Sequence, residues 1–142
     1  MRLPLIAALA LCLSALLPSA CTDCVRERCA YPALFLTVHA AFGGDYLSDA
    51  TLTQAGTPLS NELSAAACSD GSCTHAVTPP ASGPVTVSFA GYYKDASVPY
   101  VSRADACGNV IRQAVTVAMV PVNQSASPTV SPPTDRGAGC NR

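Results

Sequence analysis

The sequence has little charge, and it lacks the clustered positive charge that nucleic-acid-binding proteins use. Asp, Glu, Lys and Arg together make up 12% of the 142 residues. From Cys21 onward, seven Arg and Lys residues stand against nine Asp and Glu residues, a net charge of −2. Nucleic-acid binding normally needs a basic surface, so we expect no nucleic-acid partner. A Lys- or Arg-rich amphipathic helix is also missing, and we expect the folded part to have no membrane affinity of its own.

Histidine is equally scarce, and this limits the catalytic chemistry that the chain can carry. The two histidines are His39 and His75, and no serine lies in a nucleophile-elbow motif. The acidic residues of the middle region lie mostly in expected turns, where Asp bonds nearby backbone: Asp45, Asp49, Glu62, Asp70, Asp95 and Asp105. A carboxylate pair for hydrolysis is the enzymatic alternative. We expect a protein that is not an enzyme and that has no cofactor.

No stretch shows convincing helical periodicity, and the apolar run at the start is too short to span a bilayer. This run, Leu3–Leu17, has 15 residues, fewer than the roughly 18–20 that a membrane-spanning helix needs. Met1 and Arg2 precede it, and Pro18–Ala20 close it with small residues. The arrangement is typical of export, so residues 1–20 are expected to be a signal peptide of the lipoprotein type.

Cys21 decides the expected location of the protein. A bacterial lipoprotein signal usually has Leu three residues before the acylated cysteine, and Pro18 occupies that position here. Cys12 leaves with the signal peptide, so seven cysteines remain, and acylation of Cys21 leaves an even six. We expect a lipid on Cys21 that anchors the protein to the bacterial envelope, with the outer membrane favoured. A periplasmic or secreted protein without lipid, with one free thiol, is the alternative.

Six cysteines are candidates for disulfides in this oxidising compartment: Cys24, Cys29, Cys68, Cys73, Cys107 and Cys140. Cys68 and Cys73 are the easiest pair, because an Asp-Gly turn in ACSDGSC can bring their Cα atoms within bridging distance. Cys107 is then expected to pair with Cys24 or Cys29. Cys140 either takes the other of these two or stays unpaired.

The motif CSDGSCTH also has residue types that bind zinc. Cys68, Cys73 and His75 could supply three ligands, with His39 or Asp70 as the fourth. An exported protein meets oxidation before it meets zinc, so we expect the disulfide and no metal. His39 is expected on the solvent side of a strand.

Alternation of apolar and polar residues with a period of two dominates the middle of the chain. It is clearest at Ala33–Ala41, Pro84–Ala90 and Val110–Val120, and weaker at Asp49–Gln54, Glu62–Ala67 and Val98–Arg103. Seven or so short strands, separated by Gly, Pro and Asp, predict an all-β fold, an antiparallel β-sandwich over residues 33–121. Residues 21–32 are expected to form a cysteine-containing tether. Residues 122–142 are rich in Pro and Ser, and we expect them to be a disordered tail.

Three segments in order, DATLTQAG, GPVTVSFAGYY and RADACGNVIRQAVTVAMVP, resemble the carboxypeptidase regulatory-like modules, which bacterial lipoproteins often carry. Gly91-Tyr92, Asp105–Gly108 and Val115–Val120 occupy the positions of the module's Gly-Tyr strand end, Asp-x-Cys-Gly turn and closing strand. The resemblance implies a seven-stranded Greek-key sandwich, transthyretin-like or immunoglobulin-like, with a noncatalytic role in stability, adhesion or ligand contact. Cys68 and Cys73 depart from the plainer modules.

Three tyrosines around the loop YYKDASVPY are the candidate binding patch: Tyr92, Tyr93 and Tyr100. Exposed rings beside a lysine suit contact with a sugar or a peptide. In the structural alternative, one ring closes the end of the sandwich and the others cover the loop. We therefore expect a noncatalytic envelope lipoprotein that contacts protein or carbohydrate at the cell surface. The alternative is a secreted protease inhibitor or small-ligand module that uses the Cys68–Cys73 loop.

Overall fold

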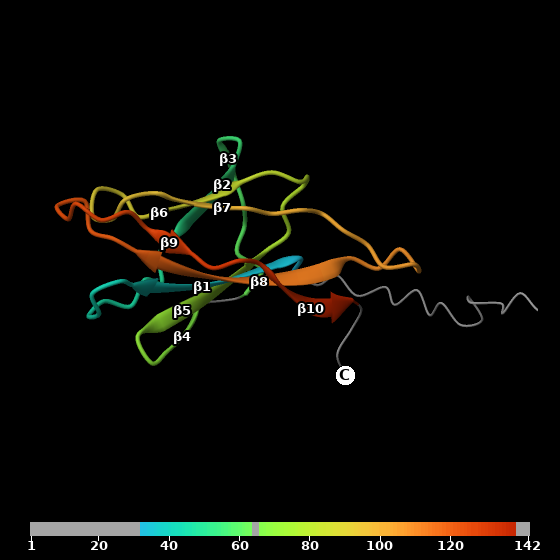
Figure 1. The fold of residues 1–142 in the computed structure, drawn as a ribbon, viewed down its shortest axis with the longest axis horizontal. Helices are drawn as coiled ribbons and strands as arrows, with labels where there is room; N and C mark the ends of the chain where they lie inside the picture. The colour runs from blue at the N-terminus through green and yellow to red at the C-terminus, as the bar shows by residue number, and fades with distance from the viewer. Residues whose placement is uncertain (1–31, 64–65, 139–142) are drawn as a thin grey trace, which may run out of the picture.

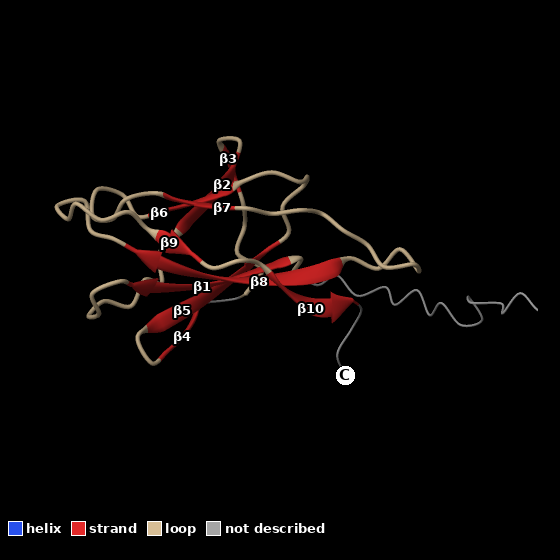
Figure 2. Cartoon of the chain, viewed as in Figure 1, coloured by secondary structure: helices blue, strands red, loops and turns tan. Residues whose placement is uncertain are grey.

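The computed structural model describes residues 32–63 and 66–138, and these residues form an all-β protein without helix (Figure 2). Ten strands follow in chain order: β1 (Leu34–Ala40), β2 (Thr51–Gln54), β3 (Thr57–Pro58), β4 (Ala67–Ser69), β5 (Ser72–Val77), β6 (Val85–Ser88), β7 (Ala96–Val98), β8 (Ile111–Met119), β9 (Thr129–Val130) and β10 (Thr134–Ala138). No segment of the described chain forms a helix of the length and apolarity needed to cross a bilayer.

Two sheets make up the fold, one layered on the other (Figure 1). The larger sheet has the order β10-β8-β1-β5-β4, with β9 also paired to β8, and the smaller has the order β3-β2-β6-β7. Apolar side chains from both sheets share one core: Leu34, Leu36, Val38, Leu52, Val77, Val85, Val87, Val98, Val115, Val117 and Met119. The all-β, layered fold that the sequence predicts is confirmed.

β1 is the central strand of the larger sheet, and its sequence LFLTVHA explains its burial. Leu34, Leu36 and Val38 are fully buried, while the residues between them are half-buried, because successive side chains of a strand point to opposite faces. The same alternation buries Val115 and Val117 in β8. The strands predicted at Ala33–Ala41 and Val110–Val120 are confirmed as β1 and β8.

β1 and β8 run parallel, with Leu36 opposite Val115 and Val38 opposite Val117. The prediction of a purely antiparallel sandwich is therefore wrong for this pair. The chain passes through the whole smaller sheet between β1 and β8, so no hairpin forces the two strands to be antiparallel. The described residues also form ten strands rather than seven.

Two predicted strands are displaced in the structure. Glu62 and Leu63 lie in a bend, and β4 begins at Ala67 instead of at Glu62. β7 covers Ala96–Val98, whereas the sequence pattern placed this strand at Val98–Arg103. Pro99 ends β7, because proline has no backbone N–H to continue a ladder of hydrogen bonds.

The segment predicted as a disordered tail contains β9 and β10, so that prediction is wrong for residues 129–130 and 134–138. Thr134 pairs with Ala114 and Asp135 with Gln113, along the edge of β8 that faces away from β1. Strand pairing satisfies backbone groups and does not require apolar side chains. Arg136 adds a contact, because its guanidinium carbon lies 5.6 Å from the centroid of the Phe35 ring.

β4 and β5 form a tight hairpin that carries the predicted disulfide. Asp70 and Gly71 both have positive φ angles, 49° and 76°, as a two-residue type I′ turn requires. The turn places Cys68 directly opposite Cys73, and their sulfur atoms are bonded. The predicted pair is confirmed.

Cys107 is also disulfide-bonded. The partners predicted for it, Cys24 and Cys29, lie outside the described residues, as do Cys21 and Cys140.

Asp105 organises the loop that leads into β8. Its carboxylate accepts hydrogen bonds from the backbone N–H groups of Asn109 (2.8 Å) and Cys107 (2.9 Å) and from the Asn109 side-chain amide (3.1 Å). These bonds, with those from Asn109 the strongest, hold the pKa of Asp105 below its ordinary value of 3.8.

Replacing both Cys68 and Cys73 by Ala should lower the free energy of unfolding by about 2 kcal/mol, because the bridge closes a very short loop in the unfolded chain. The double variant leaves no partner thiol that could reshuffle with other cysteines. Urea unfolding of both oxidised proteins measures the difference. An unchanged midpoint and slope would show that the bridge does not restrict the unfolded chain.

Acid should remove the stability that Asp105 contributes. Because its pKa is lower in the folded than in the unfolded chain, this contribution is complete above pH 3.8 and is lost as the pH falls further. Asp105→Asn keeps an acceptor oxygen but cannot titrate. Between about pH 5 and about pH 2, the wild type should therefore lose more stability than Asp105→Asn in urea unfolding. Equal losses would contradict this role.

Candidate ligand pocket at the acidic end

The parallel pairing of β1 and β8 brings the segments that follow these two strands to the same end of the sandwich. The Ala41 N–H donates to the Met119 carbonyl at 2.8 Å, and the Lys94 N–H donates to the Val120 carbonyl at 2.8 Å. Segments 41–50, 89–95 and 120–128 therefore meet there, at the left in Figure 1. The turn at 70–71 joins them, because Ser72 pairs with His39 near the end of β1. We call these four segments the acidic end.

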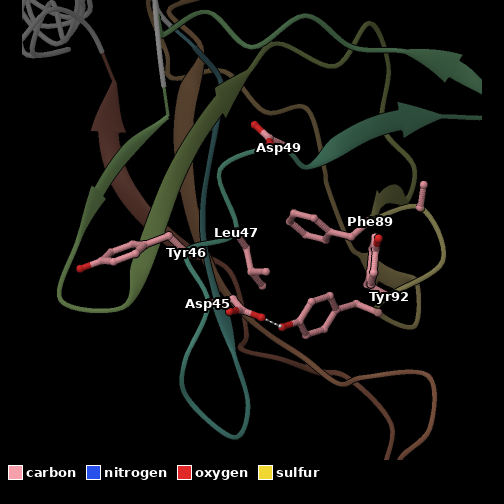
Figure 3. Close-up of a pocket in the computed structure, with 8 residues that line it drawn as sticks. Asp45, Tyr46, Leu47, Asp49, Phe89 and Tyr92 are labelled. Atoms are coloured by element: carbon pink, nitrogen blue, oxygen red, sulfur yellow. Dashed lines mark hydrogen bonds between the residues drawn. The ribbon is translucent and has the colours of Figure 1, made fainter.

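A pocket of about 440 Å³ opens between the first two of these segments. Its volume lies within the range of small-molecule sites, about 300–1,000 Å³. Eight residues line it: Asp45, Tyr46, Leu47, Asp49, Phe89, Ala90, Tyr92 and Tyr93. In Figure 3, Leu47 and Phe89 point toward the middle of this group, Tyr92 stands at its side, and the ring of Tyr46 points away.

The apolar base of the pocket is fixed by the core. Leu47 is buried, and the rings of Phe89 and Tyr93 pack edge to face with their centroids 5.8 Å apart. His75, buried in β5, holds the backbone of the 41–50 segment: its Nε2 lies 3.0 Å from the Leu47 carbonyl oxygen. Since a carbonyl only accepts, Nε2 carries the hydrogen of this bond. The base of the pocket therefore consists of the buried Leu47 and the half-buried rings of Phe89 and Tyr93, all packed against the core.

Two carboxylates stand at the rim of the pocket. The Tyr93 hydroxyl donates to Asp45 Oδ2 at 3.2 Å, drawn as a dashed line in Figure 3, and ties the 89–95 segment to the 41–50 segment. Burial of the phenol, the hydrogen bond to Asp45 and the negative charge of Asp45 all raise the pKa of Tyr93 above 10.0. The Asp49 carboxylate accepts a hydrogen bond from the Ser48 hydroxyl at 3.3 Å.

The structure separates the three tyrosines that the sequence grouped as a binding patch. Tyr92 is 77% exposed and Tyr93 is half-buried, and both line the pocket. Tyr100 is 3% exposed and packs in the core, so its assignment to the patch is wrong. The chain crosses the smaller sheet in β7 before it reaches Tyr100, which therefore lies at the opposite end of the sandwich.

Sequence reasoning missed the half of the pocket that segment 41–50 contributes. In AFGGDYLSDA, the sequence pattern singled out only the turn carboxylates Asp45 and Asp49. The signal that the sequence offers there is a pair of aromatic residues, Phe42 and Tyr46, within one loop. In the structure both rings are largely exposed, at 65% and 57%. Phe89, at the end of the strand predicted at Pro84–Ala90, both packs against the core and lines the pocket.

The residues considered for zinc do not form a site in the structure. Cys68 and Cys73 are bonded to each other, and the His75 ring is hydrogen-bonded to Leu47. Within residues 32–63 and 66–138, no group of three or more His, Cys, Asp or Glu side chains is placed to hold a metal ion.

Asp45→Asn should move the pKa of Tyr93 down toward 10.0, because it removes the negative charge that opposes the phenolate. Asp49→Asn is the matched control: it removes the same charge from the same rim but leaves the Tyr93 hydrogen bond intact. NMR titration of the Tyr93 ring measures its pKa in both variants.

The raised pKa of Tyr93 also makes the free energy of unfolding depend on pH. The raised pKa of Tyr93 means that its contribution is complete below pH 10.0 and declines at higher pH, as the unfolded chain deprotonates first. If Asp49→Asn lowered the pKa as much as Asp45→Asn, the assigned hydrogen bond would not be the cause.

Comparison with known proteins gives no assignment: no protein-family model matches the chain, and no curated protein and no solved structure matches it either.

Proposed function

We propose that the protein is a noncatalytic protein of the bacterial cell envelope, anchored by a lipid on Cys21, whose β-sandwich contacts another macromolecule through the acidic end. The resemblance to carboxypeptidase regulatory-like modules, with their Greek-key order and their roles in adhesion or ligand contact, is part of this proposal. The lipoprotein-type segment 1–20 and the cysteine count support export and anchoring.

The observation that carries the contact role is the pocket with its aromatic rim. Four large apolar side chains of the acidic end are more than half exposed: Phe42, Tyr46, Tyr92 and Val122. Exposed aromatic residues gathered at one place mark contact sites, because each ring buries a large area at a small cost in conformational entropy. The buried Leu47 and the edge-to-face pair of Phe89 and Tyr93 give this surface a preformed base, which lowers the ordering cost of binding.

The lining residues of the pocket favour contact over catalysis. They include no serine, cysteine or histidine, and one carboxylate oxygen of Asp45 is occupied by the Tyr93 hydroxyl. A nucleophile and its base within hydrogen-bonding reach is the usual arrangement for acyl transfer, and these eight residues do not supply one.

The second hypothesis, a protease inhibitor that presents the Cys68–Cys73 loop, has weaker structural support. The two residues at the tip, Asp70 and Gly71, form a turn, and the flanking residues are already paired between β4 and β5. A loop with its backbone groups paired in this way has few left for a protease. The pocket is the better candidate for the contact site.

Metabolic labelling with palmitate tests the anchor. The wild-type chain should incorporate label and fractionate with membranes, and Cys21→Ser should lose both properties. Replacing both Cys68 and Cys73 by Ser is the control, because it changes other cysteines without leaving an unpaired thiol. Intact mass of the mature protein then shows whether it begins at a modified Cys21. Unchanged membrane association of Cys21→Ser would refute the lipid anchor.

A further inference from the structure

Charge is distributed unevenly between the two ends of the sandwich. Four acidic residues and one basic residue lie at the acidic end, Asp45, Asp49, Asp70, Asp95 and Lys94, a net charge of −3. The rest of the described chain balances: Glu62, Asp105 and Asp135 stand against Arg103, Arg112 and Arg136. The negative charge of the described domain is therefore concentrated around the pocket.

The pocket carboxylates have no cationic partner within the described residues. Arg103 forms an ion pair with Asp135, and Arg136 lies over Phe35, both toward the opposite end. Lys94 is near in sequence, but its ammonium group donates to the Ala126 carbonyl at 2.6 Å and does not line the pocket. Within the described residues, the charges of Asp45 and Asp49 are therefore not neutralised by a cationic side chain.

The aromatic side chains next to these carboxylates add an attraction of the same sign. The face of an aromatic ring is negative and attracts cations. The ring of Tyr92 is exposed, and it lines the pocket together with Phe89 and Tyr93. A guanidinium group suits this combination best, because it is planar, stacks on rings and forms paired hydrogen bonds with carboxylates.

We propose that the pocket binds a positively charged side chain, arginine in particular, of a basic segment in a partner protein. The proposal names the partner chemistry for the contact role above and rests on it. A neutral glycan would also stack on the rings, but it would gain little from a net charge of −3 at this end. Charge complementarity therefore favours a basic protein segment over a neutral glycan as the ligand of the pocket.

The test uses the full chain in detergent and a defined probe, the peptide acetyl-Gly-Arg-Gly-Arg-Gly-amide. Its matched control replaces both arginines with citrulline, which has the same shape without the charge. Chemical shifts of the Tyr92 and Tyr93 rings report binding. We expect the arginine peptide to shift both rings, the citrulline peptide to bind at least about tenfold more weakly, and salt to weaken binding further.

Variants locate the site. Asp45→Asn and Asp49→Asn should each weaken the arginine peptide about threefold, and the double variant about tenfold. Glu62→Gln removes the same charge at the other end of the sandwich, where its N–H donates to the Ala76 carbonyl, and should change nothing. Tyr92→Ala should also weaken the peptide, because it removes the exposed ring.

Other outcomes overturn the proposal in distinguishable ways. Equal binding of arginine and citrulline peptides, or ring shifts with N-acetylglucosamine alone, would refute the cationic partner and leave the contact role standing. If Glu62→Gln weakened binding of the arginine peptide as much as Asp49→Asn does, the attraction would be diffuse and the pocket would not be its site. No ring shift with any of these probes would overturn both the cationic partner and the contact role of the pocket.

Discussion

The parallel pairing of β1 with β8 is the constraint on which the rest of the structure depends. Both strands bury one face through alternation, so a slip of one residue in their register would turn the apolar side chains of one strand, such as Leu36 and Val38 of β1, out of the core. The pairing fixes which chain ends are neighbours. It brings segment 41–50 beside segment 120–128, and the Lys94 backbone bond then attaches segment 89–95. The pocket is a consequence of this register.

Local sequence predicted those parts of the fold that depend on neighbouring residues. Alternation in LFLTVHA predicts β1, and the Asp70-Gly71 pair predicts the turn that lets Cys68 and Cys73 form their disulfide. The sequence pattern does not predict β5, because Cys73 and His75 occupy its buried positions in place of aliphatic residues. These two residue types point instead to a disulfide or a zinc site. β10 was missed because TDRGA has no apolar alternation and is held by the edge of β8.

The pocket could not be predicted from local patterns, because its two halves are about half a domain apart in sequence. Asp45 and Tyr93 meet only through the packing of both sheets, and His75 holds Leu47 from a third element. Tyr92 and Tyr93 were found because they are adjacent in a loop, and the same local reading wrongly added Tyr100. Loop composition therefore identifies candidates, while the topology decides which of them share a site.

The separation of charge between the two ends of the sandwich affects the rate at which the protein associates with a charged partner. Because one end is negative and the other is balanced, the molecule has an electric dipole along its strands. This dipole orients the molecule while a charged partner is still a Debye length away, about 8 Å at physiological ionic strength. Such pre-orientation raises the fraction of collisions that are productive and makes the association rate depend on salt. Under the lipid anchor proposed above, rotation would already be restricted, and this field would select which partners approach the acidic end.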